Sequence, residues 1–333
     1  ETTLSLLLAR NDGSTFGTDQ PLQNFVVHQG FGDIGFDGTN NRVLVLDTFT
    51  DELLTVDLTR GDRRVVTSPT TGSGPVMNSP LGVAVDAGNN RAVVVDSLLD
   101  AVVAVDLTSG ERIILSNSST GTGPTFTGPN DLALDTVTNR AYVVDQQQDA
   151  VFLVDLTTGD RTIITSPTIG TGPSLGNPRD VALDLVNERL FVVDSTLDAV
   201  IAVALGTGNR TIVSDSATGT GRTLVVPNRL AFDAANNRVL VADQVYGIIS
   251  IDLATGNRAV VIDPGADYGR NGSSPQGMAA DFANDRVFIS DNKSDSIFEA
   301  EIATGNYTVL SSSAAGQGTE PLIFWGIQGM GLD

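Results

Sequence analysis

The chain of 333 residues carries 40 acidic and 19 basic side chains, for a formal net charge of −21, and it contains no cysteine. The lack of cysteine excludes disulfides, thiol catalysis and Cys-ligated zinc. The negative charge disfavours nucleic acid as a partner, because phosphate backbones would be repelled. No run of 18 apolar residues is present, which argues against membrane insertion. We expect an extracellular or cell-surface protein whose export signal, if it had one, no longer precedes Glu1.

The first predicted element is an apolar strand at 3–9, before any repeated pattern begins. Leu4, Leu6, Leu7 and Leu8 give it a surface that needs a partner. This segment is a candidate either for closing the fold within one chain or for pairing with a second copy.

A repeated pattern follows, in which an apolar stretch ends in Asp, a short turn leads to a second apolar stretch, and that stretch again ends in Asp. The first series is Asp37, Asp86, Asp135, Asp184, Asp233 and Asp281; the second is Asp47, Asp96, Asp145, Asp194, Asp243 and Asp291. Both series advance by 49 residues four times and then by 48. So regular a period predicts a repeat architecture.

The second repeat shows what each unit contains. Short apolar or β-branched runs at 82–86, 91–96, 101–107 and 112–115 are separated by turn residues, which predicts four antiparallel strands in a meander. Six such units predict an all-β fold, a six-bladed β-propeller of four-stranded antiparallel blades, because radial repetition protects the edges of the sheets. We expect one domain over 1–333, with blades that begin near 32, 81, 130, 179, 228 and 276.

The longest loops connect one blade with the next, at 68–80, 116–129 and 166–178. Each contains a Gly-x-Gly-Pro element, as at 72–75, 121–124 and 170–173. A loop repeated almost verbatim indicates a structural turn rather than an active site, since an active site requires asymmetry.

Paired aspartates flank the turn between the second and third strands of five blades. The pairs are Asp47/Asp51, Asp96/Asp100, Asp145/Asp149, Asp194/Asp198 and Asp291/Asp295, whereas Gly247 interrupts the pattern in the fifth blade. One interpretation is that these carboxylates accept backbone N–H bonds within the turns. The other is a ring of weak Ca²⁺ sites, because hard cations prefer oxygen ligands.

Asymmetry appears directly after the proline that opens each blade, where the side chains should line the mouth of the central channel. The candidate ligand-binding residues there are Asn130, Asp131, Arg179, Asp180, Asn228, Arg229 and Gln276. A polar ligand could bind to them, with Arg forks on carboxylates. Alternatively, the mouth is simply wet and its Arg and Asp side chains neutralise one another.

The repeats resemble two known propeller groups. Pro-Leu-Gly-Val-Ala-Val-Asp at 80–86, followed by Ala-Val-Val-Val-Asp at 92–96, looks like the NHL repeat and is similar to the YWTD repeat of lipoprotein-receptor propellers. Pro-Asn-Asp at 129–131 and Pro-Asn-Arg at 227–229 also resemble motifs of gluconolactonase-like (SMP-30-like) propellers. That family implies a metal site with a Glu from the first blade, but Phe31-Gly32-Asp33 offers none, and Arg179 would place a cation beside the metal.

After the sixth repeat, a segment at 322–333 resembles a further innermost strand, and it includes the apolar Phe324 and Trp325. Like 3–9, it could close the ring or be donated to a neighbouring molecule, and an open head-to-tail contact would give a filament. The only histidine, His28, precedes the first blade, no Ser-His-Asp set can be assembled, and nothing singles out one acid–base pair among the many aspartates.

We therefore predict an exported, non-catalytic propeller with a structural, adhesive or binding role, whose partner is itself, an extracellular protein or a glycan. No metal site or cofactor is assigned beyond the Ca²⁺ alternative. The second hypothesis is a metal-dependent hydrolase or lyase that acts on a sugar or lactone at the channel mouth.

Overall fold

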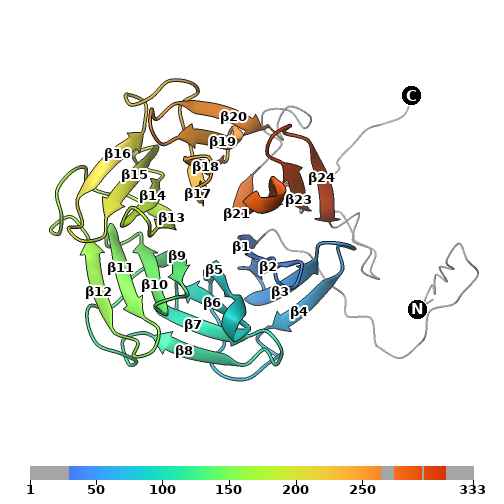
Figure 1. The fold of residues 1–333 in the computed structure, drawn as a ribbon. Helices are drawn as coiled ribbons and strands as arrows, with labels where there is room; N and C mark the ends of the chain where they lie inside the picture. Colours follow the sequence, from blue (N-terminus) through green and yellow to red (C-terminus); the bar gives the residue numbers. More distant parts are fainter. Residues whose placement is uncertain (1–29, 264–273, 295, 313–333) are drawn as a thin grey trace, which may run out of the picture.

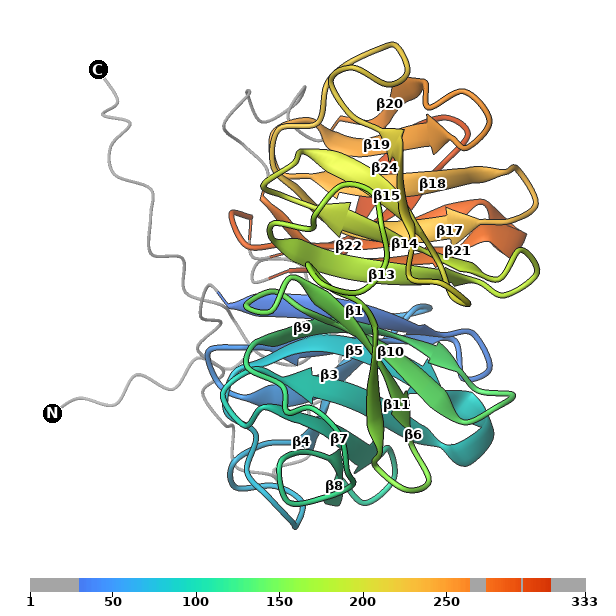
Figure 2. The same cartoon turned by 90° about the vertical axis from the view of Figure 1, so that its left-hand side faces the viewer.

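The computed structural model describes residues 30–263, 274–294 and 296–312. They form six four-stranded antiparallel sheets arranged as blades around a central axis, so the predicted six-bladed β-propeller is confirmed (Figure 1, and turned by 90° in Figure 2). The two predicted terminal strands, with Leu4, Leu6, Leu7, Leu8, Phe324 and Trp325, lie outside the described residues, as does His28.

Each blade consists of four strands in sequence order, and the innermost strand comes first. Blade 1 contains β1 (Phe31–Asp37), β2 (Arg42–Asp47), β3 (Glu52–Asp57) and β4 (Arg63–Thr67); blade 2 contains β5 (Pro80–Asp86), β6 (Arg91–Asp96), β7 (Ala101–Asp106) and β8 (Arg112–Ser116); blade 3 contains β9 (Pro129–Asp135), β10 (Arg140–Asp145), β11 (Ala150–Asp155) and β12 (Arg161–Thr165).

The second half of the ring repeats this order. Blade 4 contains β13 (Pro178–Asp184), β14 (Arg189–Asp194), β15 (Ala199–Ala204) and β16 (Arg210–Ser214); blade 5 contains β17 (Pro227–Asp233), β18 (Arg238–Asp243), β19 (Gly247–Asp252) and β20 (Arg258–Ile262); blade 6 contains β21 (Pro275–Asp281), β22 (Arg286–Asp291), β23 (Ser296–Glu301) and β24 (Tyr307–Ser312). Blades therefore begin within one residue of the predicted positions. Two short 3₁₀ turns, η1 (Ala87–Asn89) and η2 (Phe282–Asn284), follow β5 and β21.

The hydrophobic core is divided into six layers, each between two neighbouring blades. The layer between blades 2 and 3, for example, combines Val93 and Val95 with Val143 and Phe152, all fully buried. Both faces of the middle strands are therefore covered, which explains why these strands are apolar at nearly every position rather than at alternate ones. No single centre holds the core, so each blade depends on both of its neighbours.

Blades 6 and 1 meet directly and close the ring. Val43 and Val45 pack in the same apolar layer as Phe288 and Ile297. The Phe31 N–H donates to Asn292 Oδ1 at 2.8 Å, so a polar contact joins the same two blades. The described ring is thus complete with strands from Phe31 to Ser312.

The first aspartate series fixes the turn between the first and second strands of the blades. Asp86 accepts from Asn89 Nδ2 and from Arg91 Nε, both at 2.8 Å. Although burial alone would raise the pKa of Asp86, these bonds and the charge of Arg91 hold it below its usual value. Equivalent Asp–Arg pairs occur in blades 1, 4, 5 and 6.

The second aspartate series accepts backbone hydrogen bonds, as the first of the two interpretations predicts. Oδ1 of Asp145 accepts from the N–H groups of Gln147 and Gln148 at 3.1 and 3.0 Å, and Oδ2 accepts from those of Thr127 and Gly128 at 2.8 and 3.2 Å. One carboxylate therefore joins a turn to the loop that leads into its own blade. The Ca²⁺ interpretation stays a prediction.

At the outer edge, an arginine that opens the fourth strand holds the loop arriving from the preceding blade. Arg112 donates from Nε to the carbonyl oxygen of Pro75 at 2.6 Å, and from Nη1 to those of Ser68 and Thr71 at 2.8 and 2.9 Å. Gly72 lies against the next blade with φ +83°, where a Cβ atom would come within 2.1 Å of a backbone oxygen. The repeated Gly-x-Gly-Pro loops are thus structural, as predicted.

Candidate functional site

The candidate site lies on the axis, where the innermost strands begin; we call this side of the ring the upper face. In β5, β13, β17 and β21 the register shifts between the first and the third residue, so the second residue is not paired in the ladder. Such a bulge turns side chains in a new direction. The third residue of each innermost strand therefore faces the axis. These residues, one from each blade, are Asp33, Gly82, Asp131, Asp180, Arg229 and Gly277.

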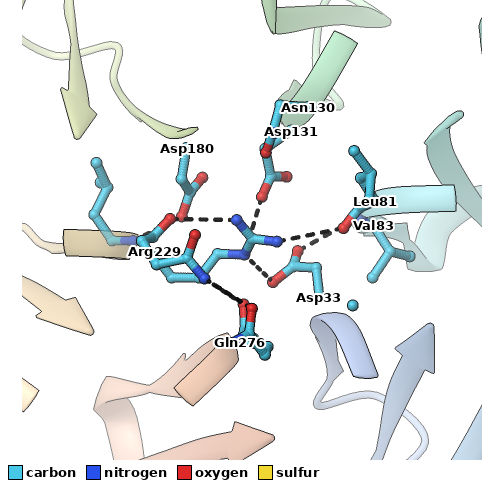
Figure 3. A network of polar contacts seen from close by, with 12 residues as sticks. Asp33, Leu81, Val83, Asn130, Asp131, Asp180, Arg229 and Gln276 are labelled. Atoms are coloured by element: carbon cyan, nitrogen blue, oxygen red, sulfur yellow. Dashed lines mark hydrogen bonds and ion pairs between the residues drawn. The ribbon is translucent and has the colours of Figure 1, made fainter. Parts of the chain in front are cut away.

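Arg229 reaches across the axis from blade 5 and is 5% exposed. Its Nε lies 3.2 Å from Asp33 Oδ1 and 3.4 Å from Asp131 Oδ2, and its Nη2 donates to the carbonyl oxygen of Leu81 at 3.4 Å (Figure 3). One guanidinium therefore contacts blades 1, 2 and 3 from the opposite side of the ring. We call Asp33, Asp131, Asp180 and Arg229 the axial cluster.

The three carboxylates are also tied to backbone. Asp33 Oδ2 accepts from the Val83 N–H of the next blade at 3.3 Å, and Asp180 Oδ2 accepts from the Leu230 N–H of its next blade at 2.6 Å. Asp131 Oδ1 accepts from the Leu132 N–H at 2.7 Å, whereas Oδ2 of the same residue is buried with no hydrogen bond and has only its ion pair with Arg229.

The two glycines of this layer leave room for the cluster. A Cβ atom on Gly82 would lie 2.4 Å from Asp131 Oδ1, and one on Gly277 would lie 2.7 Å from the backbone nitrogen of Ile34. Both distances are below any real contact, so a larger residue at either position would push the cluster or the innermost strand of blade 1 aside.

Burial makes the ionised form of each carboxylate costly, and one Arg cannot neutralise three of them. Burial, opposed by the charge of Arg229, raises the pKa of Asp180 to about 7. Burial and the charges of Asp33 and Asp180 raise the pKa of Asp131 well above its usual value, and burial raises the pKa of Asp33 as well. Burial alone would lower the pKa of Arg229, but Asp131, Asp33 and Asp180 together raise it. The cluster therefore holds protons near neutral pH.

A cavity of about 270 Å³ continues along the channel beneath the cluster. Its wall combines the three carboxylates with apolar residues such as Val83, Leu132 and Met278. A larger hollow of about 540 Å³ lies elsewhere, between blades 4 and 5, and includes Ala204, Asn209 and Thr255 in its wall. Several buried ionisable groups with raised pKa values converge at the axis, which makes it the strongest candidate site among the described residues.

The remaining predicted residues surround the mouth above the cluster. Asn130 Nδ2 donates to Gln146 Oε1 at 3.0 Å, and Asn228 Nδ2 donates to the carbonyl oxygen of Gln276 at 3.2 Å. Arg179 is partly exposed, and its Nε donates to Ser195 Oγ at 3.2 Å. Burial and then the charge of Arg229 lower the pKa of Arg179.

The structure thus separates the seven predicted ligand-binding residues into two layers. Asp131, Asp180 and Arg229 belong to the axial cluster, and the other four lie above it, where Asn130 and Asn228 are buried and Arg179 and Gln276 are partly exposed. Asp33, which pairs directly with Arg229, was not among the predicted site residues. Its position as the third residue of the first innermost strand, equivalent to Asp131 and Asp180, was the signal that could have identified it.

No metal site is apparent in the part of the chain that the structure describes, since it holds no suitably arranged group of three or more His, Cys, Asp or Glu side chains. The axial carboxylates surround a guanidinium instead. Among the same residues, no helix is long and apolar enough to cross a membrane.

Solved structures confirm the fold. A chain of the nidogen/laminin complex matches with a TM-score of 0.60 at 18% identity, covering 78% of this chain and 89% of that one. A gluconolactonase from Xanthomonas campestris matches with 0.59 at 15%, covering 80% and 85%, and a streptogramin B lyase with 0.60 at 10%, covering 87% and 86%. No protein-family model and no curated protein matches the sequence. The propeller fold therefore has relatives that bind proteins and relatives that are enzymes.

Proposed function

We propose that this protein is an exported, non-catalytic β-propeller with a structural, adhesive or binding role. One observation carries the proposal: the guanidinium of Arg229 lies among the axial carboxylates, in ion pairs with Asp33 and Asp131. A charge-paired, buried cluster offers neither an open metal position nor a nucleophile with an adjacent base. Above it, the partly exposed Arg179 and Gln276 offer polar groups to a binding partner.

The second hypothesis, a metal-dependent hydrolase or lyase, has support from the gluconolactonase and the lyase among the similar structures. At 15% and 10% identity they share the fold, and a fold does not determine an activity. The carboxylates that such an enzyme would need are those that pair with Arg229.

Two assays distinguish these hypotheses. The purified protein is titrated calorimetrically with Ca²⁺, Mn²⁺ and Zn²⁺, and hydrolysis of glucono-δ-lactone is followed in the presence of each metal. We expect no stoichiometric metal binding at the axis and no turnover above the uncatalysed rate. Turnover that is lost in Asp131→Asn or Asp180→Asn, but retained in the surface variant Leu98→Thr, would establish the enzyme instead.

We further propose that the protein assembles with copies of itself through its terminal segments. The six blades are complete within 31–312, and the sequence places apolar runs at 3–9 and 322–333 outside that range. Apolar strands pair readily with exposed sheet edges. Electron microscopy of the full chain and of a variant with Ser at Leu4, Leu6, Leu7 and Leu8 tests this. Fibres are expected only for the unmodified chain, and single rings in both samples would contradict it.

A further inference from the structure

The axial cluster carries more negative than positive charge. Asp33, Asp131 and Asp180 supply three carboxylates and Arg229 supplies one guanidinium, while the innermost strands of the other two blades contribute uncharged glycines at the same level. When all three carboxylates are ionised, three negative charges against one positive charge leave a net charge of −2. A ligand that brings a positive charge to this point of the axis would therefore be attracted.

One oxygen atom of the cluster also lacks a hydrogen-bond donor. Asp131 is 2% exposed, and its Oδ2 accepts no hydrogen bond. The ion-pair partner of this oxygen, Arg229 Nε, carries a single hydrogen atom and donates it to Asp33 Oδ1. A buried polar atom without a hydrogen bond is uncommon in folded proteins, and a bound group is one explanation for it. Because Asp131 also lines the cavity beneath the cluster, a donor in that cavity can satisfy this oxygen.

The cavity beneath the cluster has room for a ligand with an apolar body. Its volume is about 270 Å³, and all six blades contribute to its wall. The carboxylates lie at its upper end, and below them the wall is formed by apolar side chains such as Val83, Leu132, Leu230 and Met278. A bare inorganic cation would leave most of this apolar wall uncovered, whereas an organic cation can contact both parts of the cavity.

Small residues keep the channel open below the cluster. The fifth residue of every innermost strand is glycine or alanine; these residues are Gly35, Ala84, Ala133, Ala182, Ala231 and Ala279. The alanines at 84, 133, 182 and 231 are partly exposed, although their strands are the innermost ones. Solvent therefore reaches the channel beneath the cluster, and a small molecule can enter it from the lower face.

We propose that this cavity binds a small primary amine in its ammonium form. The ammonium N–H groups donate to Asp131 Oδ2 and to the other carboxylates of the axial cluster, and the aliphatic part of the amine packs against Val83, Leu132 and Met278. An ammonium group supplies three donors and one positive charge, which are the two things that the cluster lacks. The inference goes beyond the proposed structural, adhesive or binding role, because the ligand is a small molecule rather than a protein or a glycan.

Binding of the amine should depend on pH. Burial raises the pKa of Asp33 and of Asp131, and it raises the pKa of Asp180 to about 7, against the charge of Arg229. Arg229 faces these carboxylates from blade 5, and Arg179 lies above them at the mouth. Because the ammonium group favours the ionised carboxylates, the amine should bind more tightly at pH 8 than at pH 6 and should release protons when it binds.

The test is a calorimetric titration of the full chain at pH 8 with n-butylammonium, methylammonium and 1-butanol. We expect n-butylammonium to occupy one site per chain. The alcohol, which lacks the charge, should bind about tenfold more weakly or worse. Methylammonium, which lacks most of the aliphatic chain, should also bind about tenfold more weakly or worse.

Variants and methionine signals then locate the site. Asp131→Asn should weaken binding of n-butylammonium by about tenfold or more. The matched control Asp62→Asn removes the same charge from an exposed turn of blade 1 and should bind as the unmodified chain does. With methyl-labelled methionine, the NMR signal of Met278 should shift when the amine is added. The signal of Met77, which is buried in the apolar layer between blades 1 and 2, should not shift.

Equal binding of n-butylammonium and 1-butanol, or no binding at millimolar amine, would overturn the proposal. So would tighter binding at pH 6, a shift of Met77 without one of Met278, or unchanged affinity in Asp131→Asn. The ligand series and the methionine signals use the unmodified chain, so a folding defect in the variant would not affect them. Because these measurements involve neither metal nor turnover, their failure is distinguishable from a failure of the non-catalytic assignment.

Discussion

The outer edge and the axis of the ring use buried arginine in two different ways. At the edge, Arg112, Arg161, Arg210 and Arg258 repeat one arrangement, in which the guanidinium donates to backbone carbonyl oxygens of the preceding loop. At the axis, Arg229 occurs once and pairs with carboxylates from other blades. The repeated arrangement makes neighbouring blades adhere, and the unique one joins blades across the ring. Residues that recur from blade to blade thus build the propeller, whereas a residue that occurs in one blade indicates where to look for a functional site.

The edge arrangement also varies around the ring. Arg63 of blade 1 donates to Ser311 Oγ of blade 6 at 2.6 Å, so ring closure uses the same position. Between blades 5 and 6, Ile262 and Tyr307 occupy the equivalent positions, and Tyr307 packs edge-on against Phe298 with ring centres 5.6 Å apart. At these two positions, an aliphatic and an aromatic residue thus replace the polar side chains found at the other five junctions.

The largest effect is expected from Arg229→Met. Removing the guanidinium leaves the ionised groups among Asp33, Asp131 and Asp180 without a counter-charge, which should lower the free energy of unfolding by about 3–5 kcal/mol. Urea denaturation near pH 7 measures this. A loss below about 1 kcal/mol would show that the cluster is not the connection across the ring that its geometry indicates.

A second test adds one methyl group beside the cluster. Gly82→Ala places a carbon within 2.4 Å of Asp131 Oδ1 and 2.7 Å of Asp131 Cα, so overpacking should cost about 1–3 kcal/mol. The matched control is Gly206→Ala, since nothing lies within 4 Å of that Cβ position. Equal stability of the two variants would contradict the close packing of the axis.

At the edge, Arg112→Met and Arg161→Met should have similar costs, because the two residues make equivalent bonds. Each variant leaves buried carbonyl oxygens without a donor, for which we expect about 1–3 kcal/mol. Thermal and urea unfolding of both variants, side by side, provide the measurement. A cost for either one that exceeds that of Arg229→Met would reverse the distinction between edge and axis.

The pH dependence sharpens the same comparison. The pKa of Asp180 is about 7 in the folded chain and ordinarily 3.8, so the folded state binds the extra proton between these values. The contribution of Asp180 to the free energy of unfolding is fully present below about pH 4. It is lost as the pH rises through 7, by about 1.4 kcal/mol between pH 6 and 8. Aspartates such as Asp86, whose pKa is lowered, lose stability only under acid conditions and do not contribute in that window. The urea midpoint of the unmodified chain should be lower at pH 8 than at pH 6, and this difference should be smaller for Asp180→Asn. An equal difference in the two proteins would contradict the raised pKa of Asp180.

The sequence predicted the blades well and the site in part, for physical reasons. The residues that bound each strand recur in six repeats, so one ambiguous turn does not obscure the prediction of the strands. The contacts of Arg229 are different, because they depend on a register shift near Pro227 and on a side chain that spans the axis, and neither is visible as a local pattern. Asp33 was not predicted for the same reason, because its partner, Arg229, is 196 residues away in the sequence.

The central claim, that Arg229 and the axial carboxylates stabilise one another, is tested most directly by a double-mutant cycle of Arg229→Met and Asp131→Asn, with unfolding free energies measured at pH 7. Arg229 Nε lies 3.4 Å from Asp131 Oδ2. We therefore expect the double variant to be more stable than the sum of the two single effects predicts, by about 0.5–3 kcal/mol. Additivity of the two substitutions would show that the two side chains do not interact, and it would contradict this account of the axis.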